Sequence, residues 1–185
     1  LIYLAEPTVK ISNAAKGIKV KWSQCDGATG YTVYRSEYNS ETKKWSKWKS
    51  RGTAAATKSS WTDKKVTSGK TYKYTVRAVN GNFKSSYVST GSLLYLTQPT
   101  VTVKAVDNGI NVAWTQHSGA TGYRVYRSEL VNGEWSKWKS MGTAKANKNN
   151  WTDKSAEKGK TYKYTVRTVN GKTLSSYADG TAVSR

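Results

Sequence analysis

The strongest constraint on the fold is an internal repeat that fills the chain. The segment "LIYLAEPTV" at residues 1–9 returns as "LLYLTQPTV" at residues 93–101, which is an offset of 92. Further along the chain the offset falls to 90, and "GKTYKYTVR" then recurs unchanged. Each copy has the length of a small domain, so the sequence predicts two modules of one fold, residues 1–92 and 93–185.

One difference in length separates the two copies. It falls between residues 38–44 of the first copy and 130–134 of the second, which is shorter by two residues. Surface loops tolerate insertions and deletions better than packed strands do. We therefore expect a loop at this place in both modules.

Apolar and polar residues alternate with a period of two within each copy. Ile18, Val20 and Trp22 alternate with lysines, and tyrosine, valine and alanine alternate with polar residues over 72–78. This period predicts half-buried strands, and turn signals such as "DGATG" separate them. Seven or so short strands in each copy predict an all-β fold of two tandem antiparallel β-sandwiches.

The core of such a module has to be rich in aromatic residues. Hydrophobic residues make up 36% of the chain, which is below the usual level of about 45–50%. Eight Trp and thirteen Tyr compensate, because each buried Trp or Tyr removes about 150–250 Å² from water. The single cysteine, Cys25, excludes an internal disulfide and a cysteine-based metal site.

The chain is strongly basic, with a net charge of +20 from 31 Lys and Arg against 11 Asp and Glu. Such a surface attracts polyanions, among them nucleic acid, acidic cell-wall polymers and sulfated glycans. Both copies share the trait, with 17 basic and 5 acidic residues in the first and 14 and 6 in the second. No apolar run is long enough for a membrane span, so none is predicted.

Pro7 and, after it, four segments in a fixed order resemble the fibronectin type III domain. The segments are Val20–Trp22, Ala28–Arg35, Trp61–Asp63 and Gly69–Ala78, and each has a counterpart in the second copy. The resemblance covers nearly the whole chain, and it is strongest to the domains of secreted and surface proteins of Gram-positive bacteria. It implies an extracellular location, secreted or attached to the cell surface. The lack of an initiator Met and of a signal-peptide pattern indicates a piece of a longer protein with neighbouring domains.

The resemblance also implies roles for several aromatic residues. Trp22 and Trp114 would be the buried tryptophan of the second strand in each module. Tyr72 and Tyr162 would take the tyrosine-corner position, where the phenol hydroxyl bonds to upstream backbone. Asp63 and Asp153 match a turn residue of the family.

The hexapeptide "WSKWKS" occurs at residues 45–50 and 135–140. Trp45 and Trp48 are three residues apart, so in a regular strand they would point to opposite faces, one toward the core. The Trp-Ser-x-Trp spacing also resembles the tryptophan motif of cytokine receptors, where basic side chains stack on indole faces, although that motif lies near the last strand of its domain. Two interpretations stay open, a core or stacking scaffold and a platform for a ligand. The candidate ligand-binding residues are Trp45, Lys47, Trp48, Lys49, Trp135, Lys137, Trp138 and Lys139.

A basic stripe is predicted on the outer face of one strand in each module. Solvated lysines that discourage aggregation would give this pattern, and so would a polyanion-binding face. The residues are Lys73, Arg77, Lys163 and Arg167, and Tyr34 and Tyr126 on the neighbouring strand are expected to share the face.

Catalysis is not expected. The only histidine, His117, aligns with Cys25 in a turn that differs between the copies. A nucleophile with its base, or a set of metal ligands, cannot be assembled around such a position. We predict no catalytic residue, no metal and no cofactor.

These observations favour a non-catalytic extracellular spacer and adhesion segment that positions neighbouring domains. Its basic aromatic surface would bind polyanionic wall polymers or glycans, while nucleic acid is not expected because the resembled family is extracellular. One alternative is a carbohydrate-binding module with Trp48 and Trp138, or Trp61 and Trp151, as sugar platforms. Another is a module that binds a host surface protein.

Overall fold

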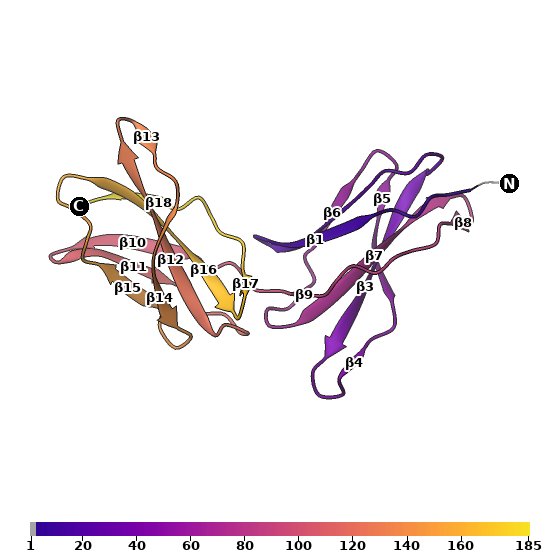
Figure 1. The fold of residues 1–185 in the computed structure, drawn as a ribbon, viewed down its shortest axis with the longest axis horizontal. Coiled ribbons are helices and arrows are strands. Elements are labelled where there is room, and N and C mark those ends of the chain that lie inside the picture. Colours follow the sequence, from indigo (N-terminus) through magenta and orange to yellow (C-terminus); the bar gives the residue numbers. More distant parts are fainter. Residues whose placement is uncertain (1–2) are drawn as a thin grey trace. The chain divides into compact units, whose positions relative to one another are not determined.

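The computed structural model describes residues 3–185, which form eighteen β-strands and no helix. The start of the predicted first module, residues 1 and 2, lies outside the described residues. The contacts divide the chain into two compact units, Leu1–Tyr95 and Leu96–Arg185 (Figure 1). No helix in the described part could serve as a membrane span.

The first unit consists of two antiparallel sheets. One sheet has three strands in the order β1-β2-β6, and the other is built around the long pair β3 and β7. Strands β4 and β5 pair with β3, while β8 and β9 pair with β7. The bounds are β1 Val9–Ala14, β2 Gly17–Trp22, β3 Gly30–Asn39, β4 Lys44–Trp45, β5 Lys49–Ala55, β6 Ser60–Asp63, β7 Thr71–Asn80, β8 Phe83–Lys84 and β9 Leu93–Leu94.

The second unit repeats this plan. Its sheets are β10-β11-β15 and a sheet around β12 and β16, with β13 and β14 on β12 and with β17 and β18 on β16. The predicted all-β fold of two tandem fibronectin type III-like sandwiches is thereby confirmed. The bounds are β10 Val101–Val106, β11 Gly109–Trp114, β12 Gly122–Val131, β13 Glu134–Trp135, β14 Lys139–Lys145, β15 Asn150–Asp153, β16 Thr161–Asn170, β17 Thr173–Leu174 and β18 Thr181–Ser184.

The division between the units differs slightly from the repeat boundary. Leu93 and Leu94 pair with Tyr72 and Thr71 of the first unit, so the contacts place residues up to Tyr95 there. The modules 1–92 and 93–185 follow the period of the sequence and stay a prediction.

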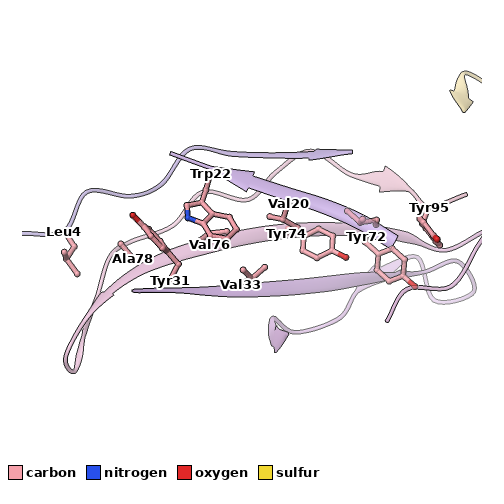
Figure 2. Packing of buried hydrophobic residues seen from close by; sticks show 11 residues of the cluster. Leu4, Val20, Trp22, Tyr31, Val33, Tyr72, Tyr74, Val76, Ala78 and Tyr95 are labelled. Carbon is pink, nitrogen blue, oxygen red and sulfur yellow. The ribbon is translucent and has the colours of Figure 1, made fainter. Parts of the chain in front are cut away.

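Aromatic residues fill the core between the two sheets of the first unit. Figure 2 shows Trp22 from β2 directed toward Tyr31 from β3, and the centroids of the two rings are 5.4 Å apart. Tyr72 and Tyr74 of β7 are also buried. A buried phenol requires a partner for its hydroxyl group, and each of these three has one. Tyr31 Oη accepts from the Cys25 amide at 2.8 Å, Tyr72 Oη accepts from the Thr67 amide at 3.0 Å, and Tyr74 Oη donates to Asp63 Oδ2 at 3.0 Å.

A β-bulge interrupts the pairing of β5 with β3. Val33 lies opposite Gly52, but the next residue, Tyr34, lies opposite Ser50, so Arg51 is the extra residue. A bulge redirects the side chain of the extra residue and bends the strand. The second unit has the same irregularity, with Met141 as the extra residue.

Candidate binding surface: an aromatic and basic ladder in each unit

A serine anchors the first hexapeptide to strand β3. The Ser46 amide donates to the Glu37 carbonyl at 2.9 Å, and the Glu37 amide donates back to Ser46 Oγ at 3.0 Å. Ser36 Oγ also donates to the Ser46 carbonyl at 2.6 Å. Ser136 makes the same three contacts in the second unit, with Glu129 and Ser128. These bonds fix residues 46–48, which belong to no strand.

Both indoles of the first hexapeptide lie on the same face. The Nζ atom of Lys73 is 4.6 Å from the ring centroid of Trp45 and 5.4 Å from that of Trp48. The expectation that the two rings point to opposite faces is wrong, because the strand breaks between them and the alternation of a regular strand does not apply. Both rings are partly exposed, and the pair encloses a lysine instead of closing the core.

Further aromatic and basic groups extend this stack. Tyr38 packs on Trp45 with centroids 5.2 Å apart, and Tyr87 meets Trp48 edge-on at 6.1 Å. The guanidinium of Arg77 lies 5.7 Å from the Tyr87 ring and donates from Nε to the Ser85 carbonyl at 2.6 Å. Lys73 and Arg77 both come from outward positions of β7. We call the whole set the first ladder: Tyr38, Trp45, Lys73, Trp48, Tyr87 and Arg77.

The second unit carries an equivalent stack. Lys163 Nζ lies 4.3 Å from the Trp135 centroid, and Arg167 lies 5.4 Å from the Tyr177 ring. Trp138 meets Tyr177 edge-on at 6.3 Å. We call Trp135, Lys163, Trp138, Tyr177 and Arg167 the second ladder. Basic side chains therefore stack on indole faces in both units.

Each ladder borders a shallow hollow. The hollow of the first unit has a volume of about 180 Å³ and that of the second about 130 Å³. Tyr34 and Tyr126 line them, so the prediction that these tyrosines share the face of the basic stripe is confirmed. The first hollow is lined by Tyr34, Trp48, Thr75, Arg77 and Tyr87, and the second by Tyr126, Trp138, Thr165, Arg167 and Tyr177. An aromatic face can stack with a ring, and a guanidinium group beside it can bind an anionic substituent of that ring.

The first ladder keeps its full positive charge, while the second is partly neutralised. A cation–π contact positions an ammonium group without neutralising it. In the described part of the first unit, no carboxylate forms an ion pair with Lys73 or Arg77, whereas Lys163 pairs with the exposed Asp179 at 3.3 Å. Ser89 stands where the second unit has Asp179. The four hexapeptide lysines, Lys47, Lys49, Lys137 and Lys139, are exposed nearby.

The proposed Trp61 and Trp151 platforms lie elsewhere. Trp61 belongs to β6 and packs, partly buried, against the core of the first unit, and Trp151 does the same in the second. The indole of Trp61 also covers Gly52. Trp48 and Trp138, by contrast, line the hollows.

A buried charge cluster is a feature that the sequence reasoning missed. Asp63 accepts from the Lys65 amide at 2.9 Å, as a turn residue does, but it is only 1% exposed and also binds Arg35 and Tyr74. The sequence did contain a signal for this cluster, because the three residues recur in the second copy as Arg127, Asp153 and Tyr164. There they make the same contacts. Burial alone would raise the pKa of Asp153, but hydrogen bonds from Ser155, Tyr164 and Arg127 outweigh it and hold the pKa below its usual value.

His117 and Cys25 occupy the same turn in the two units. His117 Nε2 lies 3.0 Å from Thr115 Oγ1, and burial lowers the pKa of its ring. Burial, and then the charge of Asp26, raise the pKa of the Cys25 thiol, which makes it a poorer nucleophile. Within residues 3–185 no three His, Cys, Asp or Glu side chains are grouped as metal ligands would be. The absence of catalysis stays a prediction.

Comparisons with known proteins give similarity at the level of structure. No family and no curated protein matches the sequence. Among solved structures, the chain is similar to a two-domain fibronectin type III segment of chicken tenascin, with 14% identity over 98% of this chain and 100% of that one and a TM-score of 0.47. It is also similar to the FN1–FN3 domains of chicken CNTN1, with 13% identity over 98% of this chain and 65% of that one and a TM-score of 0.42. The chicken interferon gamma receptor alpha chain is similar as well, with 12% identity over 97% of this chain and 97% of that one and a TM-score of 0.49.

Proposed function

We propose that the chain is a non-catalytic extracellular spacer and adhesion segment that binds acidic glycans or other polyanionic polymers through its two ladders. One observation carries the proposal: two basic side chains of one strand are held over partly exposed aromatic rings, and this arrangement occurs in both units. The net charge of +20 supports it.

The ladders combine the two properties that recognition of an acidic glycan requires. A sugar ring stacks on an aromatic face, while its anionic substituent meets an ammonium or guanidinium group. Stacking of a ligand ring such as a nucleobase on an aromatic side chain contributes about 1–3 kcal/mol, so a single contact of this order binds weakly. Two ladders in one chain raise the overall affinity for a polymer that can engage both.

The spacer role follows from the independence of the two units. Each has its own buried core of aromatic and aliphatic residues, and a chain of such modules separates the domains at its ends. The extracellular location, and an origin in a surface protein of a Gram-positive bacterium, belong to this proposal and rest on the sequence resemblance.

Retention on immobilised sulfated glycan and on anionic wall polymer tests the proposal. We expect retention at low salt and its loss near about 0.5 M salt, because the screening length falls from about 10 Å at 0.1 M to about 3 Å at 1 M. The variant K73Q/R77Q removes both cations of the first ladder. It should elute at lower salt than K10Q/K21Q, which removes the same charge from the exposed face of β1 and β2. An equal decrease in the salt concentration at elution for both variants would indicate nonspecific attraction. No retention at low salt would refute the proposal.

A second candidate function is binding of neutral carbohydrate. The observation that favours it is the aromatic lining of the hollows, in which Tyr34, Trp48 and Tyr87 meet in the first unit. Titration with neutral glucans, followed by tryptophan fluorescence, distinguishes the two functions. Binding to a neutral glucan that persists in salt supports this second candidate, because stacking is not screened as charge is.

A further inference from the structure

The first unit contains a basic pocket of about 480 Å³ next to the first ladder. The end of β3, strand β4 and the start of β5 enclose it, and the loop between β3 and β4 closes one side. Asn39 Oδ1 accepts from the amides of Glu41 and Thr42 at 2.9 and 3.0 Å, so this loop is held in place. Five of the lining residues are basic and one, Glu37, is acidic; the basic ones are Arg35, Lys44, Lys49, Arg51 and Lys70.

The equivalent region of the second unit has a different charge. Glu134 replaces Lys44, Met141 replaces Arg51, and the loop is shorter by two residues. Three basic residues remain there, Arg127, Lys139 and Lys160, against two acidic ones, Glu129 and Glu134. The repeat thus provides an internal comparison, in which one copy concentrates positive charge and the other does not.

Arg51 is incompletely neutralised. Asp63 Oδ2 accepts from Arg35 Nη1 at 2.9 Å and from the Tyr74 hydroxyl, and it lies 3.8 Å from Arg51 Nε. The Nε atom of Arg51 is buried and has no hydrogen-bond partner among the described residues. Glu37 Oε2 also lies 3.9 Å from Arg35 Nη2, but the only carboxylate paired with Arg51 among the described residues is Asp63, which Arg35 already engages. A further anion beside Arg51 would therefore be stabilising.

Lys70 is also less neutralised than its counterpart. Its Nζ atom lies 3.9 Å from Glu37, whereas Lys160 lies 3.1 Å from Glu129 and 3.0 Å from Glu157. Thr67 stands where the second unit has Glu157. The first unit therefore leaves this ammonium group available to a ligand.

We infer that this pocket binds a phosphate or sulfate ester group, with Arg51, Lys44, Lys49 and Lys70 as its ligands. Arginine and lysine are the side chains that bind tetrahedral oxyanions, through charge-assisted hydrogen bonds to several oxygens at once. Trp45 belongs to the first ladder and also lines the pocket, so a sugar on the ladder can place its ester in the pocket. The inference rests on the proposed function for the class of polymer, and it adds the group recognised and the unit that recognises it.

Titration of the ¹⁵N-labelled chain with glucose 6-phosphate, glucose 6-sulfate and glucose tests the inference. We expect the two esters, and not glucose, to shift backbone amide signals of residues 39–51, while those of residues 131–141 stay in place. The affinities of the two esters show whether phosphate or sulfate is the preferred source of the oxyanion. Equal shifts in the two units, or equal shifts with glucose, would overturn the inference.

Substitutions that copy the second unit locate the ligands. Arg51→Met and Lys44→Glu should each weaken ester binding about tenfold or more, because a hydrogen bond between charged groups contributes about 1.5–3 kcal/mol. Lys44 is exposed, so Lys44→Glu decides the matter if Arg51→Met fails to fold. The reverse pair, Met141→Arg with Glu134→Lys, should create ester-induced shifts in the second unit. Unchanged affinity in Lys44→Glu would exclude the pocket.

The outcomes separate this inference from the proposed function. Retention on the polymer without ester binding in the first unit would refute the pocket alone. Ester binding at residues 39–51 without retention on any polymer would refute the ladder function and leave the pocket in place.

Discussion

Arg35 Nη1 donates a hydrogen bond of 2.9 Å to Asp63 Oδ2, and the two residues belong to different sheets. Arg35 lies in β3 and Asp63 at the end of β6, so this ion pair connects the two layers of the first unit. The Tyr74 hydroxyl donates to the same oxygen from β7, and the Arg35 guanidinium lies 4.8 Å from the Tyr72 ring. A single carboxylate thus organises one end of the sandwich.

We expect Asp63→Asn to destabilise the first unit by about 3–5 kcal/mol, because the largely buried guanidinium group of Arg35 loses its hydrogen-bonded carboxylate. Hydrogen–deuterium exchange, read peptide by peptide, measures the free energy of opening in each unit. Peptides of the second unit serve as the internal control and should exchange as before. Unchanged protection of β3 and β7 would contradict the prediction.

The second unit should lose stability in acid because of Asp153. Its pKa is lower in the folded unit than in the unfolded chain, so the unfolded chain binds the proton more readily. The stabilisation is therefore complete above the unfolded value of about 3.9 and is lost as the pH falls below it, through the folded pKa. Unfolding of wild type and Asp153→Asn as a function of pH checks this, since the variant should show a smaller slope below about pH 4.

The first ladder should weaken when its central cation is removed. Lys73→Met keeps much of the side chain's length but loses the charge, and we expect a cost of about 1 kcal/mol for two cation–π contacts. Lys73→Arg should retain most of the stability, because a guanidinium group also stacks on indoles. The indole N–H signals of Trp45 and Trp48 report the change, and Lys84→Met on the exposed β8 is the matched control. Indole signals that shift equally in both variants would refute the stacking role.

The strands could be predicted from the sequence because their signal is local. The alternation of Ile18, Val20 and Trp22 with lysines appears directly as buried and outward positions of β2. Each alternating segment also occurs in both copies, so the same pattern predicts the strands of both units. Tyr34 could also be placed beside the basic stripe, because it lies in a regular strand adjacent to β7.

The geometry of the hexapeptide could not be predicted in this way. Its conformation depends on bonds between Ser46 and Glu37 of another strand, and a period of two says nothing about residues outside a strand. The charge cluster at Asp63 was missed for a related reason, since Arg35, Asp63 and Tyr74 come from three strands of two sheets. Only their joint recurrence in the second copy indicated a common role. The basic pocket depends on a loop length and a bulge, neither of which has a periodic signal.

Gly17 should be the glycine of the first unit that tolerates alanine least. Its φ is +135°, which side chains of L-residues rarely adopt, and an added Cβ atom would clash with the backbone carbonyl oxygen of Asp63. The β2–β6 pairing holds that carbonyl in place, so relief requires the two strands to separate. We expect Gly17→Ala to lower the free energy of unfolding by more than about 2 kcal/mol, because overpacking and backbone strain add.

Gly81 provides the control, since its φ is +55° and an added Cβ atom would meet open space. Its alanine variant should lose only about 1–2 kcal/mol of stability, which is the cost of a left-handed backbone conformation. Equal losses of protection from hydrogen–deuterium exchange in β2 and β6 for the two variants would contradict the prediction. They would show that the Asp63 carbonyl moves to accommodate the added Cβ atom, and that this end of the sandwich is less rigid than its buried ion pair implies.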